Sequence, residues 1–230
     1  MNITMIHGQS HQGSTYHIAH MLAEKLHGNV TEIFLPRDFD SFCTGCTGCF
    51  MKGAECCPHY AELQPITQAI DEADVLILAS PVYVYHAAAS MKALLDHYGY
   101  RWMVHRPAAC MFKKQAVCLS TAAGAGMKST NKDMADSLFF WGIARIYQYG
   151  MAVNAVSFDG IPTRKREKIE KDIDRLAKKI LARQGHVTPS WKTKAWFMAM
   201  HFAQRKGWNE ADAAYWKQQG WTGSKRPWKE

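Results

Sequence analysis

The stretch ADVLILASPVY, residues 73–83, is the clearest indication of the fold class. Its residues 75–79 form a continuous apolar run of strand length, which is typical of a strand covered on both faces of a parallel sheet. A Ser-Pro pair ends the run, and a helical pattern follows from His86 to about Tyr100. We therefore interpret this segment as a central strand, a loop and a helix, which together make one βα unit.

The same alternation recurs along the chain. Apolar runs at residues 3–6, 30–35 and 116–119 predict three more strands, and a fifth is expected near residues 151–158. Helices are expected at residues 14–26 and around Ile169, Ile173, Leu176 and Ile180, the latter closed by Gly185. Five such units predict an α/β fold with a doubly wound, five-stranded parallel sheet. Sheets of this kind bind ligands outside the carboxyl ends of their strands, here the loops 7–15, 80–86 and 120–127.

Composition and charge restrict the class of protein. The chain has 230 residues, of which 47% are hydrophobic and 21% charged, as in globular proteins. The net charge of +8 is uneven, because residues 161–230 carry 17 basic and 7 acidic side chains whereas residues 1–160 carry 11 and 13. Neither a signal peptide nor a membrane span is visible, so we expect a cytoplasmic protein with reduced cysteines.

The first loop, GQSHQGST at residues 8–15, is typical of a phosphate site. Its glycine spacing resembles the nucleotide P-loop, but Ser14 stands where that motif needs lysine, and Ser10 stands at the second glycine of the dinucleotide motif. What remains is a set of hydroxyls and backbone N–H groups at a helix N-terminus, which suits a phosphate monoester. The alternative is that Ser14 and Thr15 only cap the helix.

Three segments together resemble one known family. The loop at 8–15, the stretch 73–83 and the helix sequence MKALLD at 91–96 are similar to the NADPH-dependent FMN reductase branch of flavodoxin-like proteins, over about residues 1–183. The resemblance implies a sheet of order 2-1-3-4-5, FMN at the point where the strand order reverses, and NAD(P)H as co-substrate. It also implies a homo-oligomer, a dimer or a tetramer.

The resemblance also assigns residues to parts of FMN. One departure is His11, where many relatives have arginine; Tyr83 and Tyr85 have the alternative of simple packing at a strand end. In the phosphate loop the implied contacts are Ser10, Gln12, Gly13, Ser14 and Thr15; beside the isoalloxazine ring they are Pro81, Val82, Tyr83 and Val84; over its pyrimidine edge they are Thr121, Ala122, Ala123, Gly124 and Gly126.

No catalytic side chain is needed for such chemistry, because the flavin N5 accepts the hydride and the protein supplies position and electrostatics. We find no carboxylate pair, Ser-His-Asp set or zinc helix in the sequence. His17 and His20 lie three residues apart on one helix face, and we interpret them as surface histidines rather than metal ligands.

Five cysteines gather within fifteen residues. Cys43, Cys46 and Cys49 have two-residue spacing with glycines between them, a pattern that can present three thiolates to one metal centre. The iron–sulfur flavoproteins resemble this chain in placing such a motif after the second strand, which implies a [4Fe–4S] cluster with Cys56 or Cys57 as the fourth ligand. Zinc, a redox-active thiol set and a metal-free loop at a dimer interface are the alternatives.

The C-terminal third differs in composition from the rest. Residues 191–228 hold six of the eight tryptophans together with lysines and arginines. We divide the chain into a flavodoxin-like FMN-binding domain at 1–185, with a Cys-rich insertion at 36–58, and an extension at 186–230 made of two short helices and an irregular tail. We expect this extension to pack on its own domain or on a second subunit rather than on nucleic acid or lipid.

These features predict an NAD(P)H-dependent, FMN-containing oxidoreductase. Its acceptor would be a quinone, a nitro compound, a free flavin or the bound iron–sulfur cluster. The alternative hypothesis is a non-enzymatic electron carrier like flavodoxin, although flavodoxins are usually shorter and acidic. A third is a redox-sensing protein that binds a partner in one oxidation state.

Overall fold

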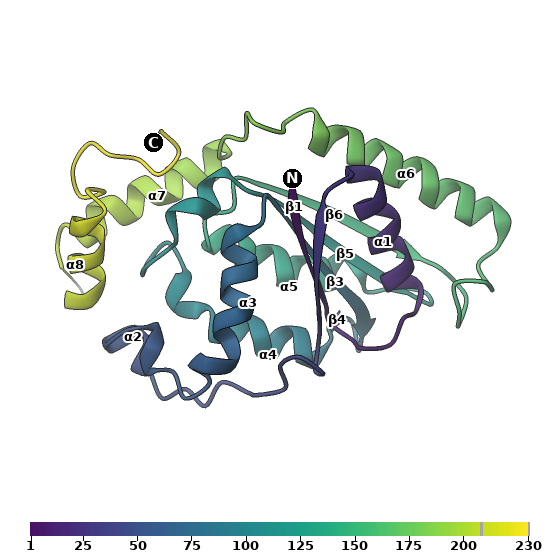
Figure 1. Cartoon of the computed structure of the whole chain (residues 1–230), viewed down its shortest axis with the longest axis horizontal. Coiled ribbons are helices and arrows are strands. Elements are labelled where there is room, and N and C mark those ends of the chain that lie inside the picture. The colour runs from purple at the N-terminus through teal and green to yellow at the C-terminus, as the bar shows by residue number, and fades with distance from the viewer. Residues whose placement is uncertain (208, 230) are drawn as a thin grey trace.

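The computed structural model describes residues 1–207 and 209–229, so Trp208 lies outside the described residues (Figure 1). The strands are β1 (Asn2–His7), β2 (Asn29–Phe34), β3 (Val75–Tyr83), β4 (His86–Ala87), β5 (Gln115–Ala122) and β6 (Arg145–Ala152). The α-helices are α1 (Ser14–Leu26), α2 (Gly48–Met51), α3 (Tyr60–Glu72), α4 (Ala89–His97), α5 (Met127–Phe140), α6 (Thr163–Leu181), α7 (Trp191–Gln204) and α8 (Glu210–Gln218). Short 3₁₀ helices are η1 (Ala54–Cys56), η2 (Gly99–Arg101) and η3 (Ala109–Lys113).

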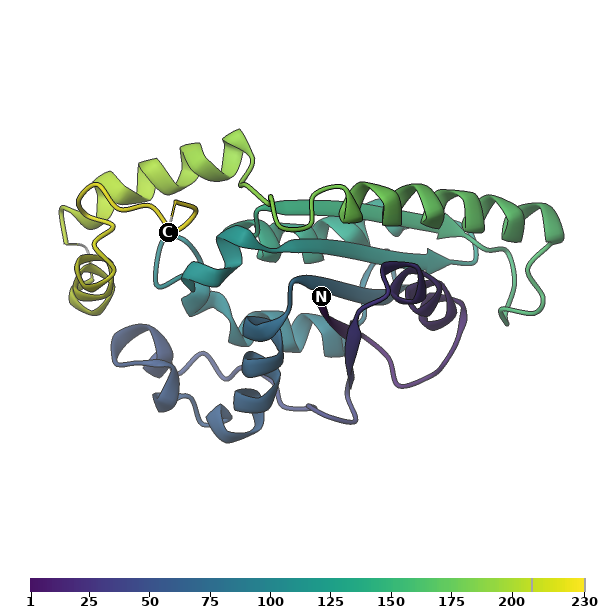
Figure 2. The ribbon, with the colours of Figure 1, turned by 45° about the horizontal axis from the view of Figure 1, so that its top comes forward.

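The main sheet is parallel, with the order β2-β1-β3-β5-β6. Numbered as parallel strands alone, this is 2-1-3-4-5, which confirms the predicted doubly wound fold. Helices α1 and α6 cover one face, and α3, α4 and α5 cover the other (Figures 1 and 2). In β3, Val75 and Ile77 pack under α1 and α6 whereas Leu76 and Leu78 pack on the opposite side, which explains the continuous apolar run.

The fifth parallel strand lies earlier than the sequence pattern indicates. A strand was expected near residues 151–158, but β6 occupies Arg145–Ala152, so only its end overlaps the expected segment. The strand forms an edge of the sheet and pairs only with β5 among the described strands. Its exposed side leaves room for polar residues such as Gln148, so no apolar run marks it.

A short hairpin replaces the expected start of the fourth helix. His86 was expected to begin that helix, but His86 and Ala87 form β4 and pair antiparallel with the end of β3, and α4 begins at Ala89. Asp133 of α5 holds the hairpin, since its Oδ2 accepts from the Ala87 N–H at 3.1 Å and lies 3.0 Å from His86 Nδ1. This hairpin places the end of β3 beside the loop that follows β5.

The C-terminal extension forms two helices and packs on the preceding domain. Phe197 of α7, Trp216 of α8 and Trp221 are fully buried together with Met103 and Phe112. The cluster is separate from the two cores of the sheet (Figure 2). Packing on its own domain is one of the two arrangements expected from the sequence. None of the helices in the described part of the chain is long and apolar enough to cross a membrane.

Candidate functional site

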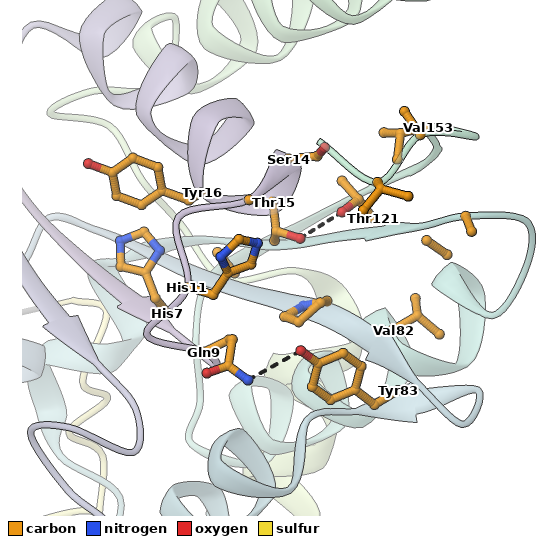
Figure 3. A pocket seen from close by; sticks show the side chains of 17 residues that line it. His7, Gln9, His11, Ser14, Thr15, Tyr16, Val82, Tyr83, Thr121 and Val153 are labelled. Atoms are coloured by element: carbon orange, nitrogen blue, oxygen red, sulfur yellow. Dashed lines mark hydrogen bonds between the residues drawn. The ribbon is translucent and has the colours of Figure 1, made fainter. Parts of the chain in front are cut away.

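A cleft opens at the carboxyl ends of the parallel strands. The cleft contains about 750 Å³ of space, with open solvent included. The first turn of α1 forms one wall, the ends of β3 and β5 form the floor, and the segment after β6 forms the far side (Figure 3). This is the position at which doubly wound sheets bind ligands, because the order of the strands reverses between β1 and β3.

The N-terminus of α1 is open toward this cleft. Gly13 is the N-cap residue and no side chain caps the helix, so its first N–H groups keep no helical partner. A Cβ on Gly13 would lie 2.8 Å from His11 Nε2, so the absence of a side chain lets the imidazole lie close to the helix start. Ser14 and Thr15 are therefore the first helical residues and do not cap the helix, contrary to the alternative considered above.

Two contacts join the loops around the cleft (Figure 3). Thr15 Oγ1 and Thr121 Oγ1 lie 2.6 Å apart and share a hydrogen bond between α1 and β5. Gln9 Nε2 donates to Tyr83 OH at 3.2 Å and so links the loop after β1 to the end of β3. Tyr83 and Tyr85 are 48% and 64% exposed, which is inconsistent with simple packing in a strand-end core.

Most residues expected around FMN line the cleft. The lining members of that set are Gly13, Ser14, Thr15, Pro81, Val82, Tyr83, Thr121, Ala122 and Ala123. The members outside the lining are Ser10, Gln12, Val84, Gly124 and Gly126. Ser10 Oγ donates instead to Leu35 O at 3.3 Å. Gly126 has a φ of +99°, and a Cβ there would lie 2.6 Å from Val82 Cγ1, so it permits close packing beneath the hairpin.

Several lining residues were not assigned from the sequence. His7, Gln9, Tyr16 and Ala79 belong to the segments around the first and third strands, and Val153, Ala155 and Val156 follow β6. The last three were missed because the fifth strand was expected to include them. His7 and Gln9 lie in the predicted loop 7–15, and their direction into the cleft follows from the sheet register rather than from any motif.

The cysteine insertion forms a second, smaller pocket. Four cysteines line it, namely Cys43, Cys46, Cys49 and Cys57, together with His59 and His97. Cys56 is exposed and does not line it. Burial, followed by the Cys57, Cys43 and Cys46 thiols, raises the pKa of Cys49. The four cysteines that line the pocket are therefore also the ones whose thiols interact electrostatically with Cys49. Because its pKa is raised, Cys49 lacks the lowered pKa of a reactive thiol.

The rest of the chain holds this insertion in place. The guanidinium of Arg106 donates to the Cys49 carbonyl, and its Nε lies 3.6 Å from Asp212 Oδ1 on α8. Asp212 is 1% exposed and also lies 2.7 Å from His105 Nδ1. Phe50 packs on the His105 ring with centroids 4.8 Å apart. The C-terminal extension thus contacts the cysteine segment through a buried ionic group.

Comparisons with known proteins agree with this architecture. An iron-sulfur flavoprotein of Archaeoglobus fulgidus is 38% identical over 64 residues, a match that spans 26% of this chain and 28% of that protein. An NAD(P)H:quinone oxidoreductase from Methanothermobacter marburgensis superposes with a TM-score of 0.62 at 16% identity, covering 83% of this chain and 98% of that chain. An azoreductase from Bacillus anthracis str. Sterne gives 0.56 at 13% identity, covering 78% and 98%. At these identities, the two structures show a shared fold.

The family itself is identified by sequence. The family model described as NADPH-dependent FMN reductase matches residues 1–156, which is more than half of the chain. The matched region contains all five parallel strands and the cleft at their carboxyl ends. The chain therefore belongs to the NADPH-dependent FMN reductase family.

Proposed function

We propose that this protein is an FMN-dependent NAD(P)H oxidoreductase. It passes electrons from a nicotinamide through FMN to a quinone, a nitro compound, a flavin or a bound iron–sulfur cluster. The observation that carries this proposal is the cleft at the switch point of the sheet, where an uncapped helix N-terminus adjoins a partly apolar floor. An FMN held in this cleft would supply the redox chemistry, namely transfer of electrons from NAD(P)H to an acceptor.

The phosphate end of the cofactor fits the wall formed by α1. The free N–H groups of the first helical turn, the Ser14 hydroxyl and one hydroxyl of the Thr15–Thr121 pair supply neutral donors, and the helix dipole favours an anion there. The His11 imidazole lies at the same helix start, where a ring N–H would be a further donor to the phosphate.

The ring end of the cofactor fits the floor of the cleft. Pro81, Val82 and Tyr83 continue from the buried part of β3, so their backbone is held by the sheet while their side chains line the opening. The backbone of Thr121–Ala123 lies opposite and offers polar groups for the pyrimidine edge. These rigid strand ends would position the isoalloxazine and limit the access of water to it.

The decisive test is spectroscopic and kinetic. We expect the protein, purified without oxygen and supplied with FMN, to show a flavin absorption doublet and to oxidise NAD(P)H in the presence of a quinone acceptor. A protein that retains FMN without oxidising NAD(P)H would instead be an electron carrier. A protein that takes up no flavin would contradict the assignment of the cleft.

We also propose a [4Fe–4S] cluster on the cysteine insertion, held by Cys43, Cys46, Cys49 and Cys57. The four side chains line one pocket, and Cys56 lies outside it. Zinc with bonds of about 2.3 Å to sulfur needs thiolates about 3.8 Å apart. Within residues 1–207 and 209–229, no three cysteine sulfurs lie within 4.8 Å of one another. In a cluster each thiolate binds a different iron atom, so the four sulfurs need not converge on one point as they do around zinc.

The cluster would lie a short distance from the flavin cleft. Helix α4 connects the two regions, because Ser90 Oγ donates to Gly8 O beside the cleft and His97 lines the cysteine pocket. Seven residues of α-helix separate these positions, a rise of about 10 Å. This proximity supports the cluster as a one-electron acceptor for the flavin.

The two candidate fourth ligands provide a matched test. We expect Cys57→Ala and Cys46→Ala to abolish bound iron while FMN stays bound, and Cys56→Ala to keep iron at the wild-type level. Iron content and the brown absorption that remains after flavin release give the measurement. Equal iron in all three variants would contradict this site. Loss of iron in Cys46→Ala and Cys56→Ala, with iron retained in Cys57→Ala, would exchange the two candidate fourth ligands.

The mouth of the cleft supports a homo-oligomer. Tyr83, Val84, Tyr85 and Val156 are all exposed there, with Val84 at 92%. An apolar rim of this kind is typical of a protein interface, and a second copy would cover it together with one side of the flavin. Light scattering during gel filtration tests this, and a monomer at every concentration would contradict it.

A further inference from the structure

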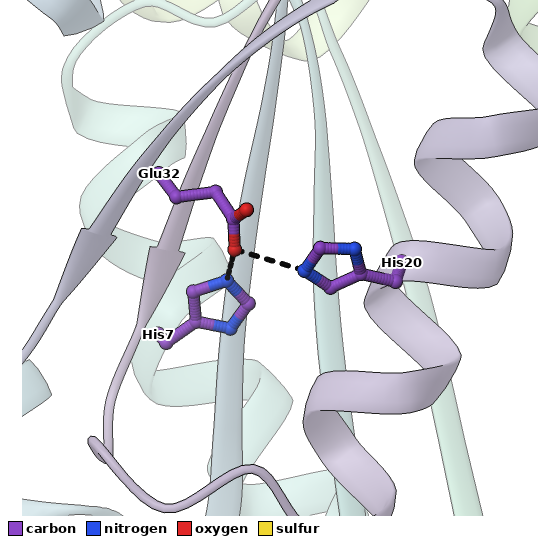
Figure 4. Close-up of side chains that lie close together, drawn as sticks. All are labelled: His7, His20 and Glu32. Carbon is purple, nitrogen blue, oxygen red and sulfur yellow. Dashed lines mark hydrogen bonds and ion pairs between the residues drawn. The ribbon is translucent and has the colours of Figure 1, made fainter.

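Three ligating side chains meet on the side of the sheet covered by α1, outside the cysteine pocket. His7 ends β1, His20 lies on α1 and Glu32 lies on β2 (Figure 4). His7 Nε2 is 3.1 Å and His20 Nε2 is 2.8 Å from the same oxygen, Glu32 Oε2. The three ligating atoms all lie within 4.8 Å of one another.

The sheet register brings these residues together. β1 pairs His7 with Phe34 and Met5 with Glu32, so His7 and Glu32 are diagonal neighbours on the face that α1 covers. His20 projects from α1 onto the same point (Figure 4). The arrangement therefore rests on two paired strands and one packed helix, and not on a loop.

Aromatic rings hold both imidazoles in place. Phe34 stacks on His7 with centroids 4.5 Å apart, and Tyr16 lies against His20 at 4.1 Å. His7 is 3% exposed, so its imidazole is held in place by its surroundings. A metal binds the neutral form of such a ring, which donates a nitrogen lone pair.

We propose that His7, His20 and Glu32 bind one transition-metal dication of the zinc class, which replaces the interpretation of His20 as a surface histidine. Two imidazoles and a carboxylate are a recognised donor set for zinc and its neighbours, whereas calcium and magnesium prefer oxygen ligands alone. Bonds of about 2.0–2.1 Å put tetrahedral donor atoms about 3.4 Å apart, so the observed 2.8 and 3.1 Å need only a small opening.

The site has an open coordination position. His20 and Glu32 are 27% and 29% exposed, so a water or a small ligand completes the coordination from the solvent side. A dication bound between His7, His20 and Glu32 takes the place of the protons that the two Nε2 atoms direct at Glu32. Each imidazole remains neutral and carries its proton on Nδ1 instead. Because His7 also lines the flavin cleft, the metal would fix that end of β1.

Cobalt(II) alone is the probe that separates this site from the cysteines. We expect the full-length protein to bind one cobalt ion with the visible bands of a nitrogen–oxygen site and without a thiolate charge-transfer band. Zinc should displace it and raise the melting temperature. His20→Ala and Glu32→Gln should each weaken binding by about a hundredfold or more, exceeding the loss from removing an outer partner of a ligand.

His17→Ala is the matched control. His17 lies on the same helix, three residues before His20, and its ring packs on Phe158 with centroids 4.8 Å apart instead of reaching Glu32. We expect this variant, and also Cys46→Ala, to keep the cobalt site. Unchanged cobalt affinity in both His20→Ala and Glu32→Gln would overturn the proposal, as would no saturable binding of cobalt or zinc by the wild type. Circular dichroism of the metal-free variants separates lost binding from lost folding.

Discussion

At the level of single residues, Ser14 lies at the start of α1 and faces the proposed phosphate position. We expect Ser14→Asp to weaken FMN binding by about a hundredfold, since a second negative charge within a few ångströms of a phosphate costs about 1–4 kcal/mol depending on the local dielectric. Flavin fluorescence during titration of the apoprotein gives the affinity.

Ser10→Ala is the control for that experiment, because the Ser10 hydroxyl bonds to Leu35 O and lies outside the cleft lining. We expect nearly wild-type affinity. A larger loss of FMN affinity from Ser10→Ala than from Ser14→Asp would show that the phosphate contacts Ser10, as the family resemblance implies.

The hairpin turn at Val84 and Tyr85 has a strained backbone. Both residues have positive φ, 48° and 68°, and Val84 is 92% exposed. A β-branched residue is strained there, whereas asparagine tolerates this conformation and is favoured in such two-residue turns. We therefore expect Val84→Asn to raise the free energy of unfolding by about 1 kcal/mol. Urea denaturation measures the change.

The exposed Val156 provides the comparison, because it is a valine without positive φ. Val156→Asn should give no gain in stability. Equal stabilisation by both substitutions would mean that polarity, and not backbone strain, accounts for the effect.

At the level of elements, α8 and the cysteine insertion are linked through Asp212. It is buried and faces both His105 and Arg106, and Arg106 in turn donates to the Cys49 carbonyl. Asp212→Asn leaves the Arg106 guanidinium without its buried counter-charge, so we expect a loss of about 3–5 kcal/mol in the free energy of unfolding. Hydrogen exchange of the backbone at residues 43–57 should also become faster.

Asp136→Asn is the matched change in an exposed pair. Asp136 and Lys132 are 54% and 70% exposed, so their interaction contributes little. We expect Asp136→Asn to lower the free energy of unfolding by less than about 0.5 kcal/mol and to leave hydrogen exchange at residues 43–57 unchanged. If hydrogen exchange of the insertion is unaltered in Asp212→Asn, the extension does not position the cysteines.

The elements that the sequence predicts well are those whose burial produces a regular apolar pattern. β3 is continuously apolar because two layers of helices cover it, and α1 shows one apolar stripe with its bounds at residues 14 and 26. The edge strand β6 carries no such pattern, so its predicted position, residues 151–158, was wrong by most of its length. The residues after β6 that line the cleft were missed for the same reason.

The residues of the candidate sites also differ in whether a single segment of sequence can predict them. Ser14, Thr15 and Thr121 follow from loop chemistry at strand ends, which a single segment of sequence carries. The group of His7, His20 and Glu32 depends on the pairing of two strands and the orientation of a helix. Nothing in the spacing of these three residues predicts their contact, because their separation along the chain has no fixed relation to the sheet register.

At the level of the whole molecule, the C-terminal extension adds a third apolar cluster to a fold that is otherwise built from two. Trp216 is fully buried in it and its Nε1 donates to His105 O at 2.6 Å, so the extension is bound to the domain by both packing and a hydrogen bond. The burial of its aromatic residues, rather than its net charge, therefore determines where this basic segment packs.

Two tryptophans of the extension test this account. Trp216 is fully buried, and Trp191 is 75% exposed at the start of α7. We expect Trp216→Ala to reduce the free energy of unfolding by about 3–5 kcal/mol because it opens a cavity against Phe197 and Trp221. Trp191→Ala should change it by less than about 0.5 kcal/mol. Chemical denaturation measures both. Similar small losses would show that the extension is not part of the cooperative fold, and a large loss from Trp191→Ala would place that side chain in an interface between copies.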